Sequence, residues 1–144
     1  MKRLVIGIGL SFLTACSPLL MVHHRHGTAL DFRAMAGRWR GTVYQKDADS
    51  FYPVELKLNA APLQEEAAGS SDYPSLGCGG TLIAVRRQGD TAVVRETLTY
   101  GQEACLDHIL LYLTANKNGT LTYAFYQSGD SVLPTPNGRA VLRK

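Results

Sequence analysis

The sequence lacks the short motifs by which common enzyme classes are recognised. It contains no Gly-X-Ser-X-Gly, no His-Glu-X-X-His and no phosphate-binding glycine loop. Gly77-Cys78-Gly79-Gly80 is rich in glycine, but it precedes an expected strand rather than a helix, so a helix-terminal anion site is excluded. Asp107 and His108 would point to opposite faces of a strand, which is poor geometry for a catalytic pair. We therefore expect no catalytic residue, no cofactor and no enzymatic activity.

The sequence also has little excess charge of either sign. It contains 15 Lys and Arg against 12 Asp and Glu, and two of the basic residues are Lys2 and Arg3. Without that pair, 13 basic residues face 12 acidic ones. Such a balance is not typical of a nucleic-acid-binding protein, so we expect no nucleic-acid partner.

Long apolar runs are absent beyond the N-terminus. A short basic start precedes an apolar run over residues 4–13, which has the length of a secretory signal and is too short to span a membrane comfortably. The run ends in Leu13-Thr14-Ala15-Cys16, which resembles the lipobox of bacterial lipoproteins. The resemblance implies that residues 1–15 are removed and that Cys16 becomes a lipidated first residue carrying fatty acids such as palmitate. The alternative is a plain signal peptide with a chance cysteine.

The lipobox resemblance implies a location and a domain organisation. Two or more acyl chains hold a protein stably at a membrane surface. In Gram-negative lipoproteins an Asp after the lipidated cysteine favours retention at the inner membrane, so Ser17 at that position favours the outer membrane. We expect a lipid-anchored envelope protein, with residues 16–35 as a tether and residues 36–144 as one small β domain. The tether contains His23, His24 and His26, which are either a solvated linker or a Zn²⁺ or Cu²⁺ site. We expect the linker, and no metal site elsewhere.

Cysteine is scarce, and two residues remain if Cys16 carries lipid. Cys78 and Cys105 form an even pair, which in an oxidising compartment favours a disulfide. A free catalytic thiol or a pair of metal ligands are the alternatives. Neither cysteine has neighbours at metal-site spacing, so we expect the disulfide.

From Gly37 onward the pattern predicts strands joined by hairpins. Gly89-Asp90 and Asn118-Gly119 are typical of tight turns. Asn59–Asp72 is polar and without useful periodicity, so we expect a long loop there. Consecutive hairpins favour an antiparallel meander of about seven or eight strands, closed into a barrel or tight sandwich. The predicted strands are Arg38–Gln45, Tyr52–Leu58, Gly79–Gln88, Thr91–Tyr100, Asp107–Ala115, Thr120–Gln127 and Arg139–Arg143.

Alternation places one carboxyl among apolar residues. In Thr91–Tyr100, Glu96 shares the more apolar face with Val94 and Leu98. A buried glutamate is costly, so Glu96 requires an arginine partner, several donors or a raised pKa. A different register would leave it exposed to solvent. The candidate partners are the arginines of the terminal strands, Arg38, Arg40, Arg139 and Arg143.

Two resemblances bear on the β domain. Gly37-Arg38-Trp39 with Arg139 or Arg143 resembles the Gly-X-Trp and terminal-Arg signature of lipocalin and avidin barrels, which implies that the Trp closes one barrel end and the Arg packs across its ring. The segment Tyr73–Leu82 (YPSLGCGGTL), with Cys105 further on, is similar to a small extracytoplasmic β domain of bacterial lipoproteins. That resemblance implies a Cys78–Cys105 bridge and no particular activity.

Two functions of different class fit this description. The first is a non-catalytic binding module for a ligand, an envelope polymer or a partner protein. The second is an envelope inhibitor or immunity protein that blocks a hydrolase such as lysozyme, by analogy of architecture and location. We expect the Asn59–Asp72 loop and Tyr73–Leu76 to form the contact surface. The candidate binding residues are Glu65, Glu66, Asp72, Tyr73 and Glu96.

Overall fold

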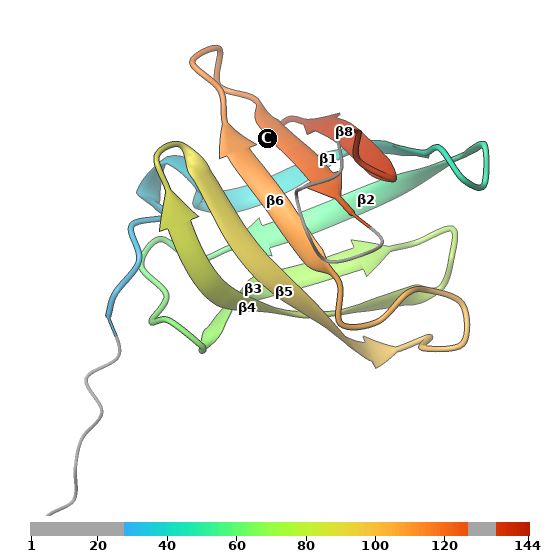
Figure 1. Ribbon diagram of the computed structural model, residues 1–144, viewed down its shortest axis with the longest axis horizontal. Helices are drawn as coiled ribbons and strands as arrows, with labels where there is room; N and C mark the ends of the chain where they lie inside the picture. The colour runs from blue at the N-terminus through green and yellow to red at the C-terminus, as the bar shows by residue number, and fades with distance from the viewer. Residues whose placement is uncertain (1–27, 127–134) are drawn as a thin grey trace, which may run out of the picture.

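The protein is a closed barrel of eight antiparallel strands (Figure 1). The computed structural model describes residues 28–126 and 135–144. Each strand pairs with the next in sequence, and the last pairs with the first. The strands are β1 Gly37–Gln45, β2 Ser50–Leu58, β3 Ala67–Tyr73, β4 Cys78–Gln88, β5 Thr91–Tyr100, β6 Leu110–Ala115, β7 Leu121–Phe125 and β8 Gly138–Leu142. The all-β prediction is confirmed, and the architecture is the barrel rather than the sandwich.

The barrel closes through a short seam between β1 and β8. β1 and β2 pair along all nine residues of each strand. In the seam, two pairs are in register, Tyr44 with Arg139 and Gln45 with Gly138. One further bridge joins Arg40 and Arg143 through backbone hydrogen bonds of 2.8 and 2.9 Å. Closure thus depends on the last residues of the described chain.

The predicted long loop at Asn59–Asp72 is wrong in its second half. Residues Ala67–Tyr73 form β3, which pairs with both β2 and β4. Its small polar residues gave no apolar alternation, yet they suit a place where neighbouring backbones approach closely. At Gly69, which has a φ of +156°, a Cβ would collide with the carbonyl oxygen of Lys57. The glycine therefore allows β3 to pack where the sequence predicts a loop.

One end of the barrel is filled by apolar side chains. The 3-10 helix η1, Arg33–Met35, precedes β1 and places Phe32 and Met35 in the core at 0% exposure. Trp39 is also buried, and its Nε1 donates a hydrogen bond of 2.7 Å to the Met35 carbonyl. Phe32 and Met35 lie in the expected tether, so the packed domain begins earlier than residue 36.

Within the described residues, no helix is long and apolar enough to cross a membrane.

The expected stacking of Arg139 or Arg143 on Trp39 is wrong. The cation over the indole ring is Lys144, whose Nζ lies 5.1 Å from the ring centroid. Arg139 instead lies over Tyr44 on the outer surface, 6.0 Å from its ring centroid. The strand register explains the difference, because Arg139 pairs opposite Tyr44 at the other end of β1.

Candidate functional site

A pocket of about 100 Å³ opens at the barrel end opposite η1. Gln45, Tyr73 and Phe125 mark this end, because they are the last residues of β1, β3 and β7. The pocket combines a polar interior with apolar side chains from two connections. It is lined by Gln45, Tyr52, Tyr73, Leu76, Glu96, Ala104, Cys105, Leu106, Ile109, Tyr123 and Phe125.

The predicted disulfide between Cys78 and Cys105 is confirmed, and it lies beside this pocket. Cys78 is the first residue of β4 and is fully buried. Cys105 belongs to the connection between β5 and β6 and lines the pocket. The bond therefore holds one wall of the pocket against the barrel.

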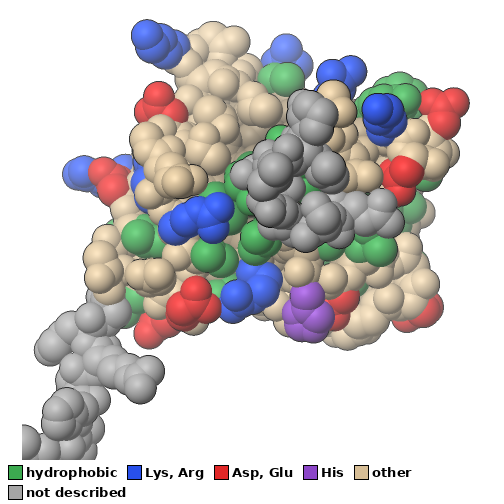
Figure 2. Space-filling model, viewed as in Figure 1, with side chains coloured by type: hydrophobic (Ala, Val, Ile, Leu, Met, Phe, Trp, Pro, Cys, Tyr) green, Lys and Arg blue, Asp and Glu red, His purple; other side chains and the backbone are tan. Residues whose placement is uncertain are grey.

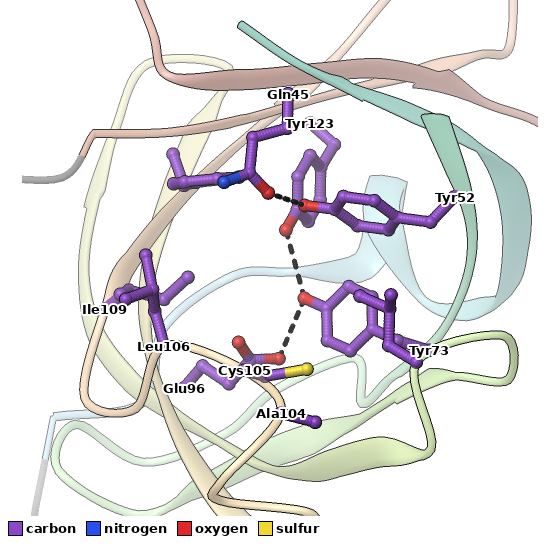
Figure 3. Close-up of a pocket in the computed structure, with 11 residues that line it drawn as sticks. Gln45, Tyr52, Tyr73, Glu96, Ala104, Cys105, Leu106, Ile109 and Tyr123 are labelled. Atoms are coloured by element: carbon purple, nitrogen blue, oxygen red, sulfur yellow. Dashed lines mark hydrogen bonds between the residues drawn. The ribbon is translucent and has the colours of Figure 1, made fainter. Parts of the chain in front are cut away.

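A chain of hydrogen bonds crosses the pocket interior (Figure 3). The Tyr73 hydroxyl donates a bond of 2.9 Å to Glu96 Oε1 and lies 3.0 Å from the Tyr123 hydroxyl. A tyrosine hydroxyl has one hydrogen, so Tyr123 donates to Tyr73 when Tyr73 donates to Glu96. On the other side, the Tyr52 hydroxyl donates a bond of 3.1 Å to Gln45 Oε1.

Glu96 is the charged group at the centre of this site. It points inward from β5 at 1% exposure, so the predicted inward orientation is confirmed. Burial raises its pKa above the ordinary value, and the charge of Asp107 adds to the rise. Two hydroxyls oppose the rise in pKa: that of Ser71, which is buried near the carboxyl without a well-formed hydrogen bond, and that of Tyr73, which donates one. Of the three predicted ways to accommodate the carboxyl, the raised pKa is present, and Tyr73 is one well-formed donor in place of the several expected.

The expected arginine partners of Glu96 lie elsewhere. Arg38 and Arg40 bind Glu55 on the outer surface, at 3.2 and 3.0 Å. Side chains on one strand alternate between the two sides of a barrel wall. Arg38 and Arg40 flank the inward Trp39, so both face solvent and cannot reach the interior.

Three tyrosines of the pocket are held in the protonated form. Burial raises the pKa of Tyr52 to about 12. Burial also raises the pKa of Tyr73 and of Tyr123 well above the usual value. All three hydroxyls therefore stay hydrogen-bond donors at physiological pH.

The five predicted binding residues do not form one surface. Tyr73 and Glu96 meet inside the pocket. Asp72 follows the opposite alternation on β3 and accepts a hydrogen bond from Tyr100 on the outside of the same end. Alternation along β5 is sufficient to predict that Glu96 points inward. The sequence places Tyr73 on a loop surface, whereas the structure places it inside the pocket.

Glu65 and Glu66 lie at the other end of the barrel, near η1. Glu65 forms an ion pair of 2.9 Å with Arg95. The backbone groups of Glu65 and Glu66 bond to Ala84, far along β4 from Cys78. The predicted contact surface therefore divides between two ends, because β3 runs the length of the barrel between them.

Sequence reasoning missed Gln45, Tyr52 and Tyr123 as site residues. The alternation in residues 121–125 does place Tyr123 on the apolar face, and Tyr52 alternates in the same way with Val54 and Leu56. Their convergence depends on barrel closure, which brings β1, β2 and β7 around one cavity. Pattern within a single strand does not carry that information.

The outer surface of the barrel carries charges of both signs. Figure 2 shows Lys and Arg side chains scattered among Asp and Glu on the face in view. In the part of the chain that the structure describes, no three His, Cys, Asp or Glu side chains are placed to hold a metal ion. The histidines His23, His24 and His26 lie outside the described residues, as does Cys16.

Comparisons with known proteins add nothing to this site. The chain matches no protein-family model. Searches of curated proteins and of solved structures found no match either.

We expect Glu96→Gln to become more stable relative to the original protein as pH rises. The folded-state pKa of Glu96 lies above its ordinary value of 4.5. Ionisation of Glu96 therefore costs more free energy in the folded state than in the unfolded state. The original protein loses stability as pH rises from 4.5 through the folded-state pKa, and Glu96→Gln does not. Each unit of pKa elevation corresponds to about 1.4 kcal/mol. Urea unfolding of both proteins from pH 4 to pH 8 measures the difference; a difference that does not change with pH contradicts the prediction.

Proposed function

We propose that the protein is a membrane-anchored, non-catalytic binding module of the cell envelope. Its partner binds at the pocket end of the barrel, and a lipid on Cys16 holds the chain at the membrane. The partner is an envelope protein or a small ligand that places one group in the pocket. The observation that carries this proposal is the apolar rim around a buried polar interior.

The rim of the pocket supports this proposal. Leu76, in the β3–β4 connection, and Leu106, in the β5–β6 connection, line the pocket at 38% and 45% exposure. Tyr100, which ends β5 at the same end of the barrel, is 44% exposed. Large apolar side chains gathered at the mouth of a polar pocket are typical of a binding site.

The position of the N-terminal residues is compatible with anchoring. Leu30 and Phe32 bond to the backbone of Pro62 and Ala60, at the end of the barrel filled by η1. The described chain therefore begins at the barrel end opposite the pocket (Figure 1). A partner could then reach the mouth without displacing the domain from the membrane.

The inhibitor alternative has less support. Acidic steering towards a cationic enzyme would fall to Glu65, Glu66 and Asp72, and of these the two glutamates lie at the barrel end away from the pocket. Glu65 is also paired with Arg95, which reduces the charge it offers. The binding module is therefore the function that the geometry favours.

Photo-crosslinking in cells tests the proposal. A photoreactive residue at Leu106 of the full chain should capture one defined partner, whereas the same residue at Val141 should not, because that side chain is 52% exposed on β8 outside the pocket. Cys16→Ala in the Leu106 chain should abolish fatty-acid labelling and release the chain from the membrane fraction. Equal capture from both positions would contradict the binding site, and a membrane-bound, labelled Cys16→Ala chain would contradict the anchor.

A further inference from the structure

Glu96 is a buried carboxyl without a cationic partner among the described residues. It forms no ion pair within 4.0 Å with a described Lys, Arg or His. The charged neighbours that act on the pocket are acidic: Asp107 acts on Glu96, and Asp47 acts on Tyr52. A cation that entered the pocket would therefore meet negative charge and no competing positive group.

The walls of the pocket are aromatic. The Tyr52 and Tyr73 rings meet edge to face with centroids 5.9 Å apart, and Tyr123 and Phe125 do so at 6.3 Å. Aromatic faces attract cations within about 6 Å, most strongly where water is excluded. Rings and a carboxylate together form the kind of surface that binds organic ammonium groups.

The hydrogen-bonding groups of the pocket that remain free are acceptors, so they favour a ligand that donates hydrogen bonds. The hydroxyl hydrogens of Tyr73 and Tyr123 point along the chain to Glu96, and the hydrogen of Tyr52 is given to Gln45. The three tyrosine oxygens and the carboxylate therefore offer lone pairs to a ligand. An ammonium group has three donors and no acceptor, which matches this surface.

The volume limits what can enter. A cavity of about 100 Å³ is smaller than ordinary ligand pockets of about 300–1,000 Å³. It is also below the roughly 150 Å³ that admits benzene. Such a cavity can enclose an ammonium group and the one or two methylene groups next to it, with the rest of the alkyl chain lying over Leu76 and Leu106.

We propose that the pocket binds a primary alkylammonium group, with the Glu96 carboxylate as its counter-ion and the tyrosine rings as its walls. The inference rests on the proposed function, since it names the group that the partner places in the mouth. Binding favours ionised Glu96, so an ammonium ligand that enters at low pH releases a proton from the carboxyl. The titratable groups facing Glu96 are Tyr52 from β2, Tyr73 from β3, Tyr123 from β7 and Asp107 before β6.

Titration of the full chain in non-ionic detergent with n-butylammonium chloride tests the inference. Backbone amide NMR shifts should change saturably at Glu96, Tyr73 and Tyr123. n-Butanol, which matches the ligand in size without charge, should bind at least tenfold more weakly. Glu96→Gln should weaken n-butylammonium binding at least tenfold, whereas Glu65→Gln, at the other end of the barrel, should leave it unchanged.

A second measurement needs no variant. Affinity of the original protein for n-butylammonium should fall at least threefold between pH 8 and pH 4, because pH 4 lies below the ordinary pKa of 4.5 above which the Glu96 pKa is raised, so protonation removes the counter-ion while the amine stays charged. Equal binding of n-butanol, equal binding by Glu96→Gln, or the absence of saturable shifts at the pocket would each overturn the inference. If Leu106 still captures a partner in that case, the proposed function stands and the ammonium assignment alone is wrong.

Discussion

Replacing Cys78 and Cys105 together with alanine is expected to lower the free energy of unfolding by about 3.5 kcal/mol. The two residues are 27 positions apart, and a cross-link closing a loop of that size removes a corresponding amount of entropy from the unfolded chain. For a domain of this size the midpoint of thermal unfolding should fall by about 15 °C. Thermal and urea unfolding of the full chain, followed by circular dichroism, measure both quantities.

Reduction of the original protein provides the control for this prediction. The reduced protein and the double alanine variant should unfold at similar temperatures, because both lack the covalent constraint. A loss below about 1 kcal/mol would show that other contacts hold the β5–β6 connection in place. One such contact is the 2.8 Å hydrogen bond from the Leu98 amide to Asp107 Oδ1.

Trp39→Ala is expected to cost about 3–5 kcal/mol, because it leaves a cavity at the filled end of the barrel. The indole is 2% exposed and its hydrogen bond to the Met35 carbonyl connects β1 to η1. Trp39→Phe keeps most of the volume and loses that bond, so it should cost about 1–2 kcal/mol. Urea unfolding of the full chain measures both.

Lys144→Ala is the matched control for the Trp39 variants. It removes the cation over the indole ring and leaves the ring in place. An exposed cation–π contact contributes about 0.5–1 kcal/mol, so the loss should be much smaller than that of Trp39→Ala. Similar losses from Lys144→Ala and Trp39→Ala would mean that the ring acts mainly through the cation rather than by filling the barrel end.

Most strands of the barrel could be predicted from the alternation of apolar and polar residues in the sequence. The predicted strand Thr91–Tyr100 has the same first and last residues as β5, because its apolar alternation is regular and a Gly-Asp turn precedes it. β3 was missed because Gly69, Ser70 and Ser71 have the composition of a loop. Their place in the sheet is set by close backbone approach to β2, which depends on a partner strand and not on local preference.

The site was predictable only in part, for a related reason. Glu96 was placed inward by alternation within one strand. Its neighbours Tyr73 and Tyr123 come from strands 23 and 27 residues away, so closure alone brings them together. Alternation along β1 turns Arg38 and Arg40 outward on either side of the buried Trp39, so charge complementarity in the sequence indicated the wrong partner.

The seam between β1 and β8 determines when the fold can be completed. β1 begins at Gly37 and β8 ends at Leu142, so the pairing that closes the barrel joins the two extremes of the domain. Until those last residues are available, β1 and β7 each present an unpaired edge to which another chain can add. Contacts of such long sequence separation form slowly. A newly synthesised chain therefore passes through an interval in which these two edges can pair with another copy of the chain.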